Sequence, residues 1–156
     1  MGVLFGSIRV MEKRLRQNHL ITMADSFSNQ IFNELELRSF DENSSSIAEN
    51  GLTLVFGMEA NENIADWSTL DDVDDFHSQS ITDDSFPQMD ANVTLSYVNL
   101  DIASGSIQVS AVPTLFKRSQ LVINHPLFDT GIRYSSIFGG GFDSEPVSYT
   151  HLRAHE

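Results

Sequence analysis

Four aspartates lie in residues 70–77, and their carboxylates are the groups of this chain best suited to binding a cation. They are Asp71, Asp72, Asp74 and Asp75. Calcium is a hard cation that takes several oxygen ligands, so calcium binding is one interpretation of this segment. An EF-hand loop, however, places acids at alternate positions with a glycine at the sixth, and this segment does not. We therefore favour a solvated acidic loop anchored by Val73 and Phe76, with calcium binding as the alternative.

Other residue patterns give no catalytic motif. Acid-pair hydrolysis needs two carboxyl groups at a fixed separation across a cleft, which adjacent loop acids do not indicate, so a hydrolase using residues 71–75 is a formal rival only. His151 and His155 have the i, i+4 spacing of a metal pair, but HExxH is absent. His19 is expected on the surface, and His125, which precedes a proline, in a structural role. The chain also lacks cysteine, a GxSxG elbow and glycine-rich phosphate loops, so we expect no catalytic residue, no cofactor and no enzymatic activity.

The charge of the chain excludes some partners. Its 156 residues include 9 Lys and Arg against 22 Asp and Glu, a formal charge of −13. This balance argues against nucleic acid as a partner and against docking on anionic lipid through a globular part. The basic residues gather near the start, at Arg9, Lys13, Arg14 and Arg16, whereas fourteen acids lie between Asp41 and Asp101.

A long amphipathic helix is expected to come first. Residues 3–40 contain no proline, and apolar residues recur at helical spacing on either side of a five-residue step that shifts the stripe slightly around the helix. The stripe consists of Leu4, Ile8, Met11 and Leu15, followed by Leu20, Ala24, Phe27, Ile31 and Leu35. Such a helix would be on the order of 55 Å long, too long for this chain to bury, so its first part must meet a membrane, another subunit or solvent. Asp41, Asn43 and the serines after them are expected to end it.

The rest of the chain predicts an acidic connection and then an antiparallel sheet. Residues 41–90 form the connection, with one short strand at 52–56 and a packed surface loop over 61–87. From residue 92 the apolar period becomes two, which predicts strands at 93–100, 107–111, 116–124 and 132–138. Glycines 139–141 are expected to act as a hinge before a flexible tail. The expected fold is α+β, a helix packed on one face of the sheet, divided into 1–40, 41–90, 91–139 and a tail at 140–156.

Several segments, taken in order, resemble type IV pilins and type II secretion pseudopilins. Residues 21–42, ITMADSFSNQIFNELELRSFDE, resemble the helix of pilin-like proteins with a prepilin-type N-terminal segment, in which a closing "FDE" or "FDD" follows the helix. Residues 66–80 contain DDVDDFH, similar to their "DDVDDYHG" block. Residues 93–101 and 115–126 resemble their strand pair that ends in "YKRVTVTVTHP". The resemblance covers about 120 residues.

This resemblance implies a structural filament subunit, a minor pilin or pseudopilin, whose helices form the filament core. The interface residues would be Leu4, Ile8, Met11 and Leu15. The implied partners are other pilin or pseudopilin subunits, the assembly machinery, and the inner membrane through an apolar segment before Met1, with a periplasmic head or an exported filament. The glycine–phenylalanine processing site and early glutamate of the family are missing, so the chain is expected to be a fragment, and PVSYTHLRAHE resembles adapter read-through. Rival interpretations are a soluble module that binds calcium or a partner through residues 71–75, and a phage or appendage structural protein.

Overall fold

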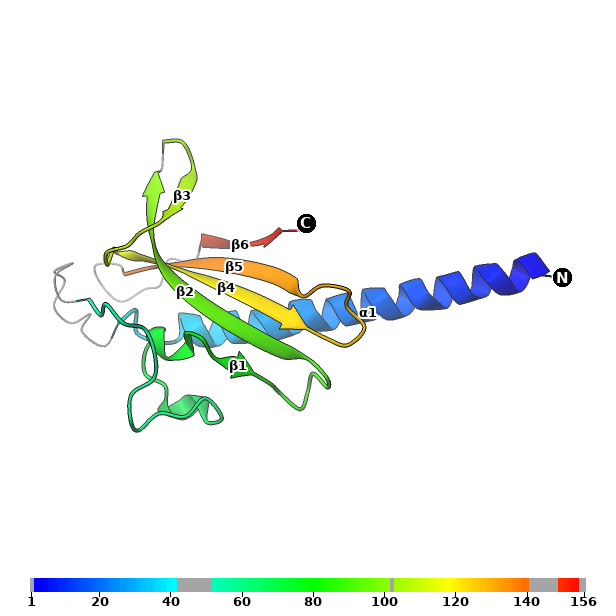
Figure 1. The fold of residues 1–156 in the computed structure, drawn as a ribbon, viewed down its shortest axis with the longest axis horizontal. Coiled ribbons are helices and arrows are strands. Elements are labelled where there is room, and N and C mark those ends of the chain that lie inside the picture. Colours follow the sequence, from blue (N-terminus) through cyan, green and yellow to red (C-terminus); the bar gives the residue numbers. More distant parts are fainter. Residues whose placement is uncertain (1, 42–51, 102, 141–148, 155–156) are drawn as a thin grey trace.

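The structure is a computed structural model that describes the backbone of residues 2–41, 52–101, 103–140 and 149–154, and the side chains of those between 10 and 140. One long helix, α1 (Gly2–Glu36), lies against one face of an antiparallel sheet (Figure 1). The predicted α+β class is confirmed, and the arrangement is compatible with a pilin-like fold. No helix of the described residues is both long and apolar enough to span a membrane.

The second half of α1 forms the core with the sheet. Ala24, Phe27, Ile31 and Leu35 are fully buried, as their helical spacing predicts. The helix ends at Glu36, five residues before the predicted terminator Asp41. That aspartate does not cap the helix, because its side chain accepts hydrogen bonds from Thr53 and from more distant groups.

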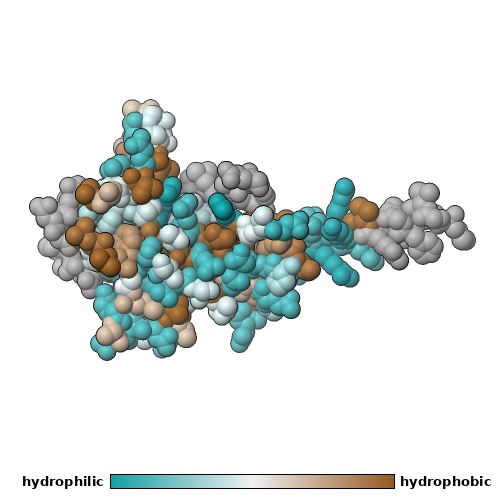
Figure 2. Space-filling model, viewed as in Figure 1, coloured by the Kyte–Doolittle hydropathy of each residue, from teal (hydrophilic) through white to brown (hydrophobic). Residues whose placement is uncertain are grey.

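The first half of α1 extends beyond the sheet, and every described side chain from Val10 to His19 is exposed (Figure 1). The change of face between the two halves is large, not slight: at about 100° per residue, the five-residue step from Leu15 to Leu20 turns the stripe by roughly 140°. Met11 and Leu15 therefore lie on the side of the helix opposite the buried stripe, and they are 65 % and 60 % exposed. Figure 2 shows apolar side chains among polar ones on this protruding part.

The sheet has the strand order β1-β2-β4-β5-β6, with β3 paired to the end of β2. The strands are β1 (Ser80–Ile81), β2 (Asp90–Asp101), β3 (Ser106–Val109), β4 (Phe116–Asn124), β5 (Ile132–Gly139) and β6 (Tyr149–Ala154). Alternate residues of β2 are buried, and β4 has the predicted bounds. Helix α1 contacts β4 and β5.

Two segments differ from their predicted structure. Residues 52–56 form no strand, because Leu54 and Val55 are exposed and the segment has no neighbouring strand to pair with among the described residues. Residues 149–154, predicted as part of a flexible tail, have the backbone of β6 and pair with β5, which offers an open edge of unpaired backbone groups. Part of the predicted hinge is also held in place by a hydrogen bond, because the Gly140 N–H donates to the Leu115 carbonyl.

Candidate functional site

The aspartates of residues 70–77 lie mostly inside the molecule. Asp72, Asp74 and Asp75 are buried and only Asp71 is exposed, so the prediction of a solvated loop is wrong for three of the four. The anchors were predicted correctly, because Val73 and Phe76 are buried and hold the short 3-10 helix η3 (Asp74–Phe76) against the core. A second 3-10 helix, η2 (Trp67–Thr69), precedes this segment.

A buried lysine neutralises one part of this acidic segment. Lys117 Nζ donates to Asp74 Oδ1 at 2.5 Å, to Asp41 Oδ2 at 3.3 Å and to the Phe40 carbonyl at 2.5 Å. The Lys117 side chain has no exposed surface. An ammonium group has three N–H donors, and here each has an acceptor. All three hydrogen-bond donors of the Lys117 ammonium group are therefore satisfied.

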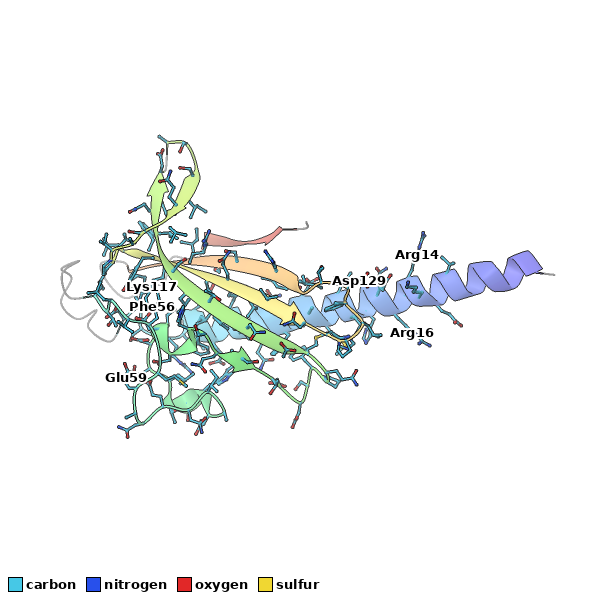
Figure 3. The ribbon with its side chains drawn as sticks, in the orientation of Figure 1. Arg14, Arg16, Phe56, Glu59, Lys117 and Asp129 are labelled. Atoms are coloured by element: carbon cyan, nitrogen blue, oxygen red, sulfur yellow. The ribbon has the colours of Figure 1, made fainter. Side chains whose placement is uncertain are left out.

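Aromatic rings enclose the same ammonium group. Lys117 Nζ lies 4.4 Å from the Phe40 ring centroid, 5.3 Å from that of Tyr97 and 5.5 Å from that of Phe56. Figure 3 shows Lys117 and Phe56 together near the C-terminal end of α1. Cations are attracted to ring faces at such distances, more strongly where water is excluded. We call this set the lysine cluster: Lys117, Asp41, Asp74, Phe40, Phe56 and Tyr97.

Burial raises the pKa of two acidic groups in the lysine cluster, the Asp74 carboxyl group and the Tyr97 hydroxyl. It raises the pKa of Asp74 from 3.8 to about 7, an effect that the nearby Lys117 ammonium opposes but does not cancel. Burial also raises the pKa of the Tyr97 hydroxyl, with the carboxylates of Asp74 and Asp41 adding to the effect. The Tyr97 hydroxyl donates to the Thr53 carbonyl at 2.8 Å, so it stays protonated and structural.

A second group of carboxylates lies on the other side of the same segment. We call it the carboxylate cluster: Glu59, Glu62, Asp71 and Asp75, which each place one carboxylate oxygen within 4.8 Å of the others. Figure 3 shows Glu59 on the connecting loop, apart from Lys117. Burial raises the pKa of Asp75 from 3.8 to about 8, and the Glu62 carboxyl group beside it contributes. Oxygen donors of this kind suit a hard divalent cation.

The four predicted calcium ligands thus separate into two sets. Asp71 and Asp75 belong to the carboxylate cluster. Asp74 pairs with Lys117, and Asp72 Oδ1 accepts the Asp74 N–H at 2.6 Å. Glu59 and Glu62 were missed because nothing in the sequence indicates that the loop returns to residue 71.

Two of the histidines have structural hydrogen bonds. His77 Nδ1 accepts the Leu95 N–H at 3.0 Å, and burial lowers its pKa. His125 Nδ1 accepts the Leu127 N–H at 3.1 Å in the turn after β4. His19 is exposed on α1, and the side chains of His151 and His155 lie outside the described residues.

The lysine cluster joins the segments that carried the family resemblance. Asp41 belongs to the FDE segment, Asp74 to DDVDDF and Lys117 to FKR. Lys117 was missed, yet a signal exists: its alternation with Ser119, Leu121 and Ile123 places it on the buried face of β4. No protein-family model matches this chain, and neither a curated protein nor a solved structure matches it significantly.

Proposed function

We propose that this protein is a non-enzymatic, pilin-like structural subunit that assembles through the first half of α1. The observation that carries the proposal is the exposed part of α1: Val10, Met11 and Leu15 are between 55 % and 65 % exposed. Exposed apolar side chains grouped on one element are typical of a surface that contacts another molecule. Because this part of α1 extends beyond the sheet (Figure 1), another molecule can reach it.

The direction of the apolar stripe supports contact with a second copy of the chain. Met11 and Leu15 lie opposite the face that packs on the sheet, so a neighbouring helix can reach them while the sheet domain stays in place. Each square ångström of apolar surface removed from water contributes about 25 cal/mol, less the large cost of association. Two or three side chains per subunit therefore give a weak pairwise contact, which repetition along a filament would strengthen.

The sheet domain fits the role of an outer, rigid head. The polar residues of the lysine cluster are buried, and Lys117 pairs with Asp74 and Asp41 there, which favours a structural role for the residues shared with pilin-like proteins. In this proposal Leu4 and Ile8 extend the interface; the helix backbone includes them, but their side chains lie outside the described residues. The proposal also includes an apolar segment before Met1 that anchors the subunit in the inner membrane, with the head in the periplasm.

Sedimentation velocity of the full chain between about 10 and 300 µM tests the assembly step. We expect concentration-dependent association of the wild type. Leu15→Asp should weaken it at least about tenfold, because a carboxylate resists burial between helices. Gln17→Asp is the matched control: it adds the same charge to the same exposed part of α1, about 160° away from Leu15 measured the short way round, and should change association less than about twofold. A monomeric wild type, or equal loss in both variants, would overturn assembly through this stripe.

The membrane anchor has its own test. The coding DNA upstream of the Met1 codon should encode a short basic leader, a glycine and an apolar run with one early glutamate. A stop codon directly before Met1 would refute the anchor and leave the association experiment to decide the rest.

A further inference from the structure

The carboxylate cluster concentrates negative charge in one small volume. Glu59 and Glu62 come from the loop before η2, Asp71 from the turn that leads into η3, and Asp75 from η3 itself. One carboxylate oxygen from each of the four lies within 4.8 Å of the others. Like charges this close repel, so acids alone do not make this arrangement favourable.

A further observation is the buried Oδ1 atom of Asp75. This side chain is fully buried, and its Oδ2 accepts the N–H groups of Asp71 at 3.0 Å and Asp72 at 3.1 Å. Its Oδ1 is buried, and no N–H or hydroxyl group of the described residues donates to it. The Glu62 carboxyl group lies in hydrogen-bonding range of Asp75, so without a cation this oxygen is satisfied only when the two carboxyl groups share a proton. A divalent cation at this point would take the place of that proton, satisfy the buried oxygen and offset the repulsion between the carboxylates.

Lys117 does not serve as that cation. Its three donors are engaged by Asp74, Asp41 and the Phe40 carbonyl. The two sides of the segment 70–77 are therefore unequal: the lysine cluster contains its own positive charge, whereas the carboxylate cluster contains four acids.

We propose that Glu59, Glu62, Asp71 and Asp75 bind one calcium ion. Calcium–oxygen bonds measure about 2.3–2.6 Å, so oxygens on opposite sides of the ion stand about 4.6–5.2 Å apart. Four oxygens within 4.8 Å of one another fit that sphere. Magnesium–oxygen bonds of about 2.0–2.1 Å give about 4.2 Å at most and demand a strict octahedron, so magnesium fits less well. Bound calcium would join the loop at Glu59 to the turn at Asp71 and fix the outer edge of the head.

Isothermal titration of the full chain with CaCl₂, and separately with MgCl₂, tests the site. We expect one calcium per chain with a Kd on the order of 10⁻⁵ to 10⁻³ M and at least about tenfold weaker binding of magnesium. Trp67, the single tryptophan, lies between Glu62 and Asp71, so a change in its fluorescence on addition of calcium would report the same event locally.

Two variants and a matched control make the test specific. Asp71→Asn and Glu62→Gln should each raise the Kd for calcium at least about tenfold. Both positions reach the surface, and circular dichroism would verify their folding. Asp84→Asn removes the same charge from an exposed position outside the cluster and should alter the Kd less than about twofold. No calcium binding up to 10 mM, equal affinity for magnesium, or equal weakening by Asp84→Asn would each overturn the proposal.

Discussion

Replacing Lys117 by methionine should be among the most destabilising single changes in the sheet domain. The variant keeps an unbranched side chain of similar length among the three rings but removes the ammonium. It leaves Asp74 Oδ1 and the Phe40 carbonyl without the hydrogen bonds that Lys117 makes to them. Asp41 loses less, because it also accepts hydrogen bonds from the Thr53 N–H at 2.8 Å and from the Thr53 hydroxyl.

The size of the effect follows from these contacts. Removing one partner of a buried ion pair costs about 3–5 kcal/mol of unfolding free energy, because the other charge stays buried without compensation. In the folded state the pKa of Asp74 is already raised from 3.8 to about 7 by burial, so the stability that its protonated form contributes is lost as the pH rises through about 7. Without Lys117 this pKa rises further. The difference between wild type and variant should therefore be larger at pH 8.5 than at pH 6.

Urea unfolding followed by Trp67 fluorescence and circular dichroism, in the presence of a chelator, measures both effects. The control is Arg118→Met, which removes a positive charge from the next residue of β4 on the opposite face and should cost less than about 1 kcal/mol. The double variant Lys117→Met/Asp74→Asn should recover at least about 1 kcal/mol, because it removes the uncompensated charge. The reasoning is refuted if Lys117→Met costs no more than Arg118→Met, or if the double variant is less stable than Lys117→Met.

Three further predictions concern the core and the surface. Phe27→Ala should lower the unfolding free energy by about 3–5 kcal/mol in the same assay, because Phe27 is fully buried and stacks on Phe86, whereas the exposed Asn29→Ala should change it by less than about 0.5 kcal/mol. Gly140→Ala should cost about 1–3 kcal/mol, since its Cβ would lie 2.9 Å from the Phe40 ring; Gly139→Ala meets its nearest atom at 3.5 Å and should be nearly neutral. The pKa of Asp83 lies below 3.8 because the Ser85 N–H, the Ser85 hydroxyl and Gln30 donate hydrogen bonds to its carboxylate, so its contribution to stability is present above pH 3.8 and is lost as the pH falls. Asp83→Asn should therefore reduce the loss of melting temperature on acidification in thermal melts. An unchanged loss would contradict the assignment.

The regular elements could be predicted from the sequence because their periods are local. The spacing of Phe27, Ile31 and Leu35 predicts the buried face of the helix, and alternation predicts β2 and β4. Local pattern failed at residues 52–56, where an apolar run has no neighbouring strand to pair with among the described residues. Whether a run becomes a strand depends on a partner that the run itself does not specify.

The two clusters could be predicted only in part, because they depend on contacts between distant residues. Lys117 and Asp74 are 43 positions apart. Alternation places Lys117 on the buried face of β4, and a buried lysine implies an acidic partner. Nothing in the sequence says which of the fourteen acids in residues 41–101 that partner is. Glu59 and Glu62 depend in the same way on the path of a loop without regular structure.

The two clusters also explain why a segment so rich in aspartate can fold inside the molecule. The backbone N–H groups of Asp71, Asp72 and Asp74 satisfy carboxylate oxygens within the segment itself, and Lys117 supplies a positive charge from β4 on one side. On the other side the remaining charge reaches the surface at Glu59 and Asp71, where a cation from solution can approach. Lys117 would then stabilise the interior of the sheet domain, and a bound calcium ion would stabilise its outer edge. The assembly surface on α1 depends on neither cluster, so calcium should alter the stability of the head without changing the effect of Leu15→Asp on association.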